Sequence, residues 1–262
     1  MLEAKACVLN VCDPLFVEIE RTFPGRISYI PSMKISLRFL AGLGWAIMFL
    51  LGVNGNASAH SMNCDAKLPR THAQLAQNDQ NSPNHLELSR EIGGGAAIDL
   101  DVCTADLTVL GGIGDKLRVT VDLGNLEDKL TAGDYLETLD ASPRNARVEL
   151  HLPPEVKARV VIVLPAGTSK LDLNLVRGSL RFEAARISGQ REVNLVSGHL
   201  DFLGNADSYE HLDANVVMGS FHDYRQNGSG HGVLVSRSQS GTGKGSIDLN
   251  VVKGSLDLKP WD

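Results

Sequence analysis

The stretch Leu171–Phe182, which reads LDLNLVRGSLRF, decides the fold because close variants of it recur towards the C-terminus. The later copies are EVNLVSGHLDF from Glu192, LDANVVMGSFHDY from Leu212 and IDLNVVKGSLDL from Ile247. Aligning them gives one column of asparagines and one of glycines: Asn174, Asn194, Asn215 and Asn250, and Gly178, Gly198, Gly219 and Gly254. Both columns advance by 20, 21 and 35 residues. A fixed period near 20 is typical of stacked-repeat folds.

Each copy alternates apolar and polar residues at the spacing of a β-strand. Leu171, Leu173 and Leu175 share one face, and Gly178 supplies the backbone freedom for a turn before Leu180 resumes that face. One copy cannot bury its apolar face alone, so the copies are expected to stack with their Asn columns side by side. A weaker fifth copy, IDLDVCTADLTV at Ile98–Val109, has Asp101 at the Asn position and Ala105 at the Gly position.

Upstream of the repeats, short alternating segments such as HLELSREI, KLRVTVDL and ARVVIVL are separated by Gly, Asn, Asp and Pro. This pattern is typical of strands and turns. The sequence therefore predicts an all-β fold: a β-solenoid-like or β-helix-like stack of about 20-residue two-strand repeats, preceded by several antiparallel strands. The 35-residue step leaves two interpretations of QNGSGHGVLVSRSQSGTGKG open, a degenerate repeat or a long Gly/Ser loop.

The N-terminal region has the layout of a targeting segment. From Met33, basic Lys34 and Arg38 precede an apolar run that ends at Val53, and the triplet Ala57–Ala59 follows. We predict a signal peptide at 33–59 cleaved after Ala59. The alternative is an uncleaved signal anchor, through which alone we expect the protein to be attached to a membrane. Residues 1–32 are predicted to be a non-native extension, with translation starting at Met33. Residues 60–84 are predicted to be a flexible polar linker, and residues 85–262 the β-repeat domain.

Export would leave two cysteines, Cys64 and Cys103, in the mature chain. Two cysteines in an oxidising compartment suggest a disulfide. The alternative is that Cys103 is a small buried apolar residue in a strand.

Composition and motifs exclude several functions. A net charge of −6 argues against nucleic acid as a partner, and 5% aromatic residues give little support to a stacking platform. No HExxH, CxxC, GxSxG or P-loop motif is present, so we predict no catalytic residues, no metal and no cofactor. The Asn column is interpreted as a structural amide ladder.

Carboxylates are the remaining candidates for chemistry. An acidic column precedes the asparagines by two residues and could bind a cation such as calcium or form a solvated charged face: Asp99, Asp172, Glu192, Asp213 and Asp248. The pairs Asp201 with Asp223 and Asp172 with Glu192 are the candidates for general acid/base spacing, although any regular ladder brings carboxylates that close.

The copies LDLNLVRGSLRF, EVNLVSGHLDF and IDLNVVKGSLDL, preceded by AAIDLDVCTADLTV, resemble the bacterial putative-adhesin family of β-strand repeats, a domain of unknown function. The resemblance covers about residues 85–262. It implies an exported or envelope-associated, β-solenoid-like protein without known catalytic residues. The third copy departs from the pattern, since Asp223 falls in the column of Phe182, Phe202 and Leu258. We therefore expect irregular stacking at that repeat.

These observations favour an exported, non-enzymatic scaffold or adhesin-like domain of the bacterial cell envelope, located in the periplasm or at the cell surface. Its partner would be an unknown envelope protein or glycan. Two alternatives are a polysaccharide-active β-helix enzyme and an envelope sensor that binds a ligand or a cation. A concave site with two acids and aromatic walls would favour the enzyme.

Overall fold

The computed structural model describes residue 64 and residues 75–76, 79–111, 114–124, 130–183 and 188–261. All of them belong to one compact unit, His60–Asp262. The predicted extension (1–32), the predicted signal peptide (33–59) and most of the predicted linker (60–84) lie outside the described residues.

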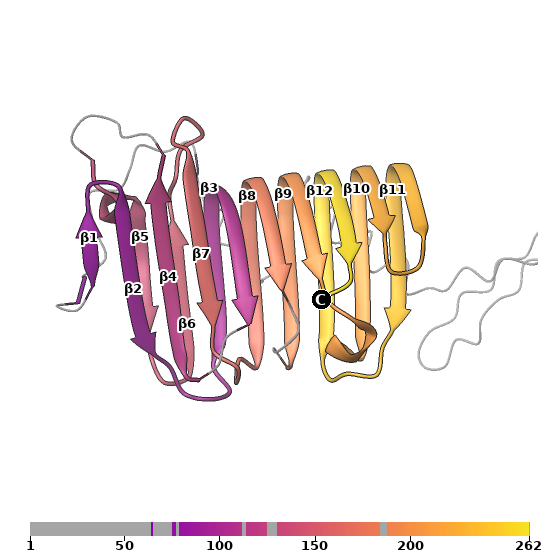
Figure 1. Ribbon diagram of the computed structural model, residues 1–262, viewed down its shortest axis with the longest axis horizontal. Coiled ribbons are helices and arrows are strands. Elements are labelled where there is room, and N and C mark those ends of the chain that lie inside the picture. Colours follow the sequence, from indigo (N-terminus) through magenta and orange to yellow (C-terminus); the bar gives the residue numbers. More distant parts are fainter. Residues whose placement is uncertain are drawn as a thin grey trace, which may run out of the picture. The chain divides into compact units, whose positions relative to one another are not determined.

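The described chain is all-β, as the alternating segments predict. Its strands are β1 Gln80–Ser82, β2 His85–Glu91, β3 Ala97–Gly111, β4 Lys116–Leu123, β5 Leu136–Ala141, β6 Asn145–Leu150, β7 Ala158–Leu164, β8 Lys170–Glu183, β9 Gln190–Leu203, β10 His211–Asp223, β11 Gly228–Ser240 and β12 Ser246–Lys259. They form one open sheet in the order β1-β2-β4-β7-β3-β8-β9-β12-β10-β11, with β6 and β5 branching from β3 (Figure 1). Two short 3-10 turns, η1 Ala132–Tyr135 and η2 Ala206–Ser208, interrupt the connections.

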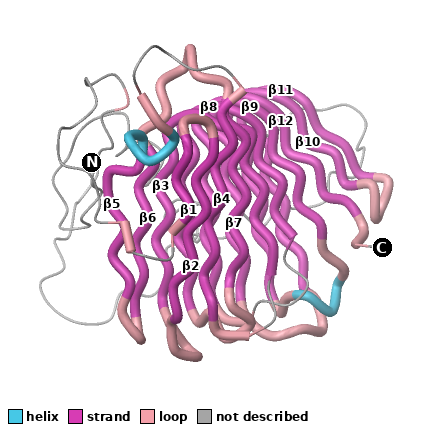
Figure 2. The backbone as a smooth tube through the Cα atoms, turned by 60° about the vertical axis from the view of Figure 1, so that its left-hand side comes forward, coloured by secondary structure: helices cyan, strands magenta, loops and turns pink. Residues whose placement is uncertain are grey.

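The repeat copies are parallel neighbours in full register. Asn174 of β8 lies opposite Asn194 of β9, Asn194 opposite Asn250 of β12, and Asn250 opposite Asn215 of β10. Each copy is one long strand that curves over near its glycine, and the register omits one residue there, such as Val176 in β8 (Figure 2). The prediction of two strands per repeat is therefore wrong in this detail, because hydrogen bonding to both neighbours continues through the bend.

The copies do not stack in chain order. The last copy, β12, lies between β9 and β10. The 35-residue step explains this arrangement, because it contains β11, which pairs antiparallel with β10 at the edge of the sheet. The segment is thus not a long loop: it adds one more strand to the stack, as a degenerate repeat would, but this strand runs antiparallel to its neighbour. With one edge of β10 paired to β11, its other edge accepts β12, which also pairs with β9.

The sheet divides at β3. The first part of β3 pairs with β6 and its second part with β7, while β8 pairs along nearly all of its length. One branch continues through β5, and the other through β4, β2 and β1. The pairs β1–β2, β2–β4, β4–β7 and β5–β6 are antiparallel, whereas β6 and β7 are parallel to β3. Because β1 belongs to the sheet, the described strands begin at Gln80, before the predicted domain boundary at His85.

The inward columns of both parts of the bent strands form one apolar core. Leu173, Val193, Leu249 and Ala214 are fully buried neighbours in one column. Full burial of such a Val or Leu side chain contributes roughly 1.5–3 kcal/mol, so repetition of the same apolar residue at the same height stabilises each added strand. Among the described residues, no helix is long and apolar enough to cross a membrane.

Candidate functional site

The Asn column forms a continuous amide ladder on the outer face of the first part of the bent strands. Each Nδ2 donates to the Oδ1 of the next strand: Asn215 to Asn250 at 3.1 Å, Asn250 to Asn194 at 3.0 Å, and Asn194 to Asn174 at 3.0 Å. Ser236 of β11 donates to Asn215 at one end, at 2.7 Å. All the amides therefore point the same way along the sheet.

The other end of the ladder is a carboxylate. Asn174 donates to Asp101 Oδ1 at 2.9 Å, where the weaker fifth copy has Asp at the Asn position. A carboxylate only accepts when ionised, so it terminates a one-directional row of donors. Burial raises the pKa of Asp101, and the Asn174 hydrogen bond opposes this shift. The ladder uses an oxygen and a nitrogen of each internal amide, so a ligand would have to displace these bonds.

The acidic column lies beside the ladder with its members paired strand to strand. Asp99 lies opposite Asp172, Asp172 opposite Glu192, and the column continues through Asp248 to Asp213. Burial and then the neighbouring carboxylates raise the pKa values of Asp172 and Asp248. Like charges opposite each other destabilise a sheet. Among the described residues, the three-donor metal group is found elsewhere, on the second part of the strands.

Replacing Asp248 with Asn is expected to stabilise the protein at neutral pH by about 0.5 kcal/mol, because it removes one of the repelling carboxylates. The folded-state pKa of Asp248 is raised above the ordinary value of 3.8, so the folded state holds this proton more strongly than the unfolded state. Wild-type stability at this site therefore increases as the pH falls through the folded-state pKa towards 3.8. The difference between D248N and wild type should shrink over the same interval.

Urea unfolding at pH 7.5 and pH 4 checks this prediction. Glu91→Gln is the matched control, because it removes the same charge from an exposed position outside the column, where Glu91 pairs with Lys116. It should change stability little at either pH. A D248N variant that is less stable than wild type at pH 7.5 would contradict the repulsion argument.

The second part of the strands carries a cluster that local sequence spacing misses. His199 and Asp201 lie on β9, Ser255 and Asp257 on β12, and His222 on β10. His199 Nε2 lies 2.9 Å from Asp201 Oδ1 and 4.0 Å from Asp257 Oδ2. His222 Nδ1 lies 3.1 Å from Asp257 Oδ1. The signal was available in the repeat alignment, which places His199 with Ser255 and Asp201 with Asp257, but a search for His motifs within one segment cannot reveal it.

One of the two candidate carboxylate pairs is not assembled. Asp201 lies opposite Asp257 on the outer face, whereas Asp223 is buried in the inward column opposite Leu258. The two carboxylates therefore belong to opposite faces of the sheet. Asp172 and Glu192 are direct neighbours, but they belong to the acidic column.

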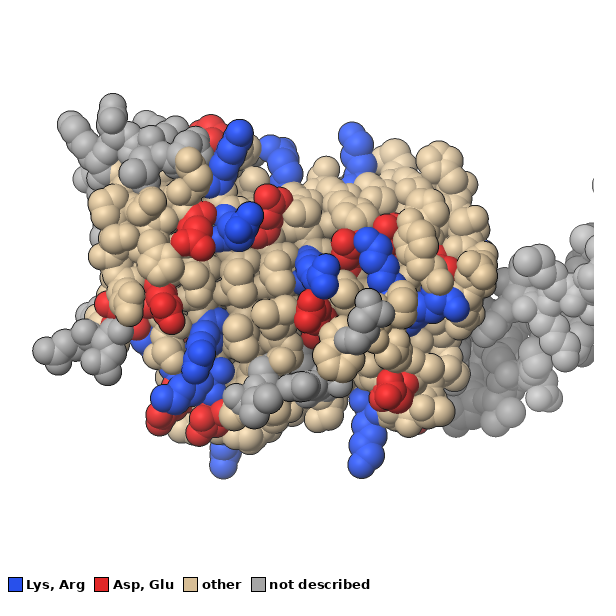
Figure 3. Space-filling view, in the orientation of Figure 1, with Lys and Arg blue, Asp and Glu red and all other residues tan. Residues whose placement is uncertain are grey.

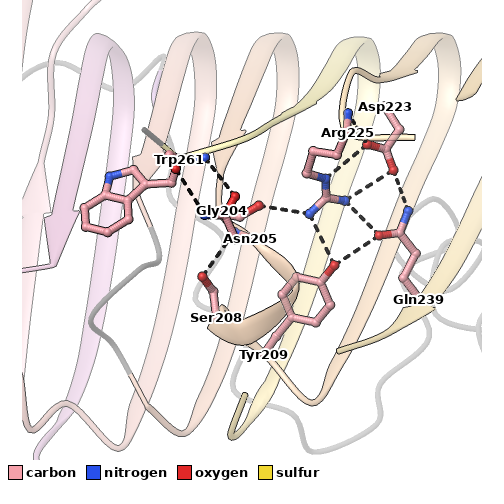
Figure 4. A network of polar contacts seen from close by, with 8 residues as sticks. All are labelled: Gly204, Asn205, Ser208, Tyr209, Asp223, Arg225, Gln239 and Trp261. Atoms are coloured by element: carbon pink, nitrogen blue, oxygen red, sulfur yellow. Dashed lines mark hydrogen bonds and ion pairs between the residues drawn. The ribbon is translucent and has the colours of Figure 1, made fainter. Parts of the chain in front are cut away.

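Asp223 is neutralised within the core, so the expected irregular stacking does not occur. The register continues from Asp223 through Leu258 to Phe202. Arg225 folds back so that its Nε lies 3.0 Å from Asp223 Oδ1, and Gln239 donates to Oδ2 at 2.6 Å (Figure 4). Burial alone would raise the pKa of Asp223, but the hydrogen bonds from Arg225 and Gln239 lower it.

Arg225 links this acid to the neighbouring loop. It also donates to the Gly204 carbonyl, the Tyr209 hydroxyl and the Gln239 side chain, at 3.1, 3.2 and 2.7 Å (Figure 4). Its guanidinium lies 5.9 Å from the ring centroids of Phe202 and Tyr209. The network therefore joins the end of β10 to the residues that flank η2 and to β11.

A second buried cation, Arg191, was also not predicted from the sequence. It is fully buried in the column where other copies have Leu171, Leu212 and Ile247. Burial lowers its pKa to about 10, and it donates one bond, from Nη1 to the Ser208 carbonyl at 3.2 Å. Its Nε and Nη2 have no hydrogen-bond partner among the described residues.

Two hollows of about 260 and 410 Å³ indent the described surface. The first is lined by Asp106 and Asp122 without an aromatic side chain. The second is lined by Tyr209 and Tyr224 without a carboxylate. Neither of these two hollows combines two acids with aromatic walls. On the face seen in Figure 3, positive and negative side chains are interspersed and do not form one large charged patch.

Cys64 and Cys103 are bonded, with their Cα atoms 5.5 Å apart. Cys103 is fully buried in β3 at the residue that the register with β8 omits. The equivalent Val196 and Val252 in later copies are exposed. The disulfide thus attaches Cys64 to the bend of the first parallel strand, and disulfides are typical of oxidising, exported environments.

The strand order and the outer columns define an all-β protein with a sheet of parallel repeats. Comparison with known proteins does not narrow this class further. No family model matches the sequence, and no curated protein matches it. Among solved structures, the chain is similar to one described as a putative cell adhesion protein from Clostridium sporogenes. The TM-score is 0.44 at 14% identity, over 69% of this chain and all of the other. Similarity at this level carries no functional argument.

Proposed function

We propose that this protein is an exported, non-enzymatic β-repeat scaffold that binds a partner in the bacterial cell envelope in the manner of an adhesin. The parallel strands would act as a short β-solenoid-like stack that holds equivalent side chains at one height. The disulfide between Cys64 and Cys103 supports an oxidising location, in the periplasm or outside the cell.

The observation that carries this proposal is a row of exposed apolar side chains at the bend of four adjacent strands. This bend ridge consists of Val196 of β9, Val252 of β12, Met218 of β10, and Val233 and Leu234 of β11. Val233 is 78% exposed and lies opposite Met218. Contiguous exposed apolar surface is a mark of protein–protein contact sites. The five ridge side chains carry no hydrogen-bonding group, which favours a protein partner over a glycan, and the exposed Lys253 opposite Met218 adds one cation at the margin of the ridge.

Retention of envelope proteins on the immobilised, disulfide-bonded protein tests the proposal. Replacing Met218 and Val233 together with Ser should reduce retention at least about tenfold, as expected when the centre of an apolar contact is removed. Tyr224→Ser is the matched control, because it removes an exposed ring outside the ridge. Equal retention by all three proteins would reject the ridge as the binding surface.

The enzyme alternative has its own readout. If the purified protein releases reducing ends from envelope polysaccharides, it is a polysaccharide-cleaving enzyme and the scaffold proposal is wrong. The sensor alternative predicts a ligand-dependent increase in melting temperature without loss of binding in the ridge variant.

A further inference from the structure

Three side chains on the outer face of β9 and β12 have the donor set and spacing of a transition-metal site. His199 Nε2, Asp201 Oδ1 and Asp257 Oδ2 offer one nitrogen and two carboxylate oxygens, all within 4.8 Å of one another. Tetrahedral Zn²⁺ with bonds of about 2.1 Å places its ligand atoms roughly 3.4 Å apart. The observed separations of His199 Nε2 from the two acids, 2.9 and 4.0 Å, bracket that value.

The sheet holds these donors in place before any ion binds. Asp201 and Asp257 are direct neighbours in the parallel register of β9 and β12, which are both internal strands. Side chains on paired internal strands have fixed Cα positions, so only side-chain rotation is needed to close the site. Sites built on such elements are more precise than sites on loops.

Neighbouring side chains orient the donors. Ser255 Oγ lies 2.6 Å from His199 Nδ1. A hydrogen bond at the other ring nitrogen is the usual support for a metal-binding histidine, because it fixes the ring and its tautomer. His222 contacts Oδ1 of Asp257, which leaves Oδ2 directed towards His199.

A lysine ammonium group currently occupies the space between the carboxylates. Lys259 Nζ lies 2.5 Å from Asp201 Oδ1 and 3.6 Å from Asp257 Oδ2. Its side chain is 36% exposed, so its flexible stem can rotate towards solvent. One ammonium supplies a single charge between two acids, whereas a divalent ion supplies two and also binds the imidazole.

From this arrangement we infer that His199, Asp201 and Asp257 bind a divalent transition-metal ion, with Zn²⁺ the preferred species, and that Lys259 is displaced when the ion enters. An imidazole ligand and only two carboxylates suit zinc better than calcium, which takes six to eight oxygens. A tetrahedral ion would have one further coordination position, which water or a partner side chain could take. The site stands whether or not the bend ridge binds a partner.

Calorimetric titration of the purified chain with ZnCl₂ tests this inference. We expect one Zn²⁺ per chain and no binding of Ca²⁺ at equal concentration. His199→Ala and Asp257→Asn should each weaken zinc binding at least about tenfold, and Ser255→Ala should weaken it by about the same factor through loss of orientation. Lys259→Met should tighten it, because the internal competitor is removed while the length of the side chain is kept.

The matched control is His211→Ala. His211 and Asp213 are both on β10, next to β12, and His211 Nε2 lies 3.0 Å from Asp213 Oδ2. The pair therefore repeats the His-x-Asp spacing of His199 and Asp201, but it belongs to no three-donor group among the described residues. It should leave zinc binding unchanged. The inference is overturned if neither wild type nor K259M binds zinc, or if H199A binds as tightly as wild type. Circular dichroism on each variant separates loss of the site from loss of the fold.

Discussion

Replacing Gly254 with Ala should lower the free energy of unfolding by about 4 kcal/mol or more, whereas the same change at Gly232 should cost about 1–2 kcal/mol. Both glycines have a positive φ that L-residues rarely adopt, +144° at Gly254 and +138° at Gly232. Both substitutions therefore carry similar backbone strain. They differ in what the added methyl group meets.

A Cβ at Gly254 would lie 1.7 Å from the carbonyl oxygen of Gly198 on β9, whereas a Cβ at Gly232 meets nothing within 4 Å. The two glycines belong to the same row, in which Gly254 is internal, between Gly198 and Gly219, and Gly232 lies at the end, opposite Gly219. The difference between the two variants thus isolates the contact between stacked strands. The measurement is denaturant unfolding, with the free energies of unfolding compared between variants whose m-values are equal. Equal losses of unfolding free energy in the two variants would show that backbone strain alone requires glycine.

The weak fifth copy supports the same explanation. Ala105 occupies the glycine position in β3, and its carbonyl oxygen is the atom that a Cβ at Gly178 would meet, at 2.0 Å. On its other side β3 changes partner, from β6 before this residue to β7 after it. No paired residue of β6 or β7 lies opposite Ala105, and Ala105 is not among the described residues with a positive φ, so a methyl group meets neither the contact nor the strain there.

The repeat alignment predicts the in-register columns because equivalent residues in parallel strands must bury equivalent side chains. It does not predict their order. The position of β12 between β9 and β10 depends on the pairing of β11, whose Gly- and Ser-rich sequence has a weak strand pattern. The alignment places His199 and Ser255 in one column, but it does not predict that they are direct neighbours, because that depends on the strand order. The two residues are 56 positions apart in the sequence.

A period-2 pattern also does not predict that each strand continues through its bend. Alternation changes phase at Val176 and its equivalents, which reads as the end of one strand and the start of another. Hydrogen bonding to two neighbours keeps the strand continuous through this point. The repeat alignment also does not predict how buried polar side chains are neutralised. Asp223 looks out of place in its apolar column because its partner, Arg225, lies beyond the end of the strand.

Replacing Arg225 with Met should destabilise the protein by about 3–5 kcal/mol, because it leaves Asp223 buried without its cation. Asp223 is 3% exposed and would keep the hydrogen bonds from the Gln239 side chain and from the backbone N–H of residue 225, but no cationic partner. The loss should be smaller at low pH, where protonation of Asp223 removes the uncompensated charge. Denaturant unfolding of R225M at pH 7 and pH 4 measures both effects.

The double variant D223L/R225M distinguishes a buried charge from a lost packing contact. Leu258 of β12 lies opposite Asp223 in the same inward column, so we expect the core to accept a leucine at position 223 as well. Replacing a buried ion pair with apolar residues of similar volume is often neutral or stabilising. We therefore expect the double variant to recover most of the stability that R225M loses. A double variant as unstable as R225M would mean that the Arg225 bonds to Gly204, Tyr209 and Gln239, and not neutralisation of Asp223, hold β10 to β11 and η2.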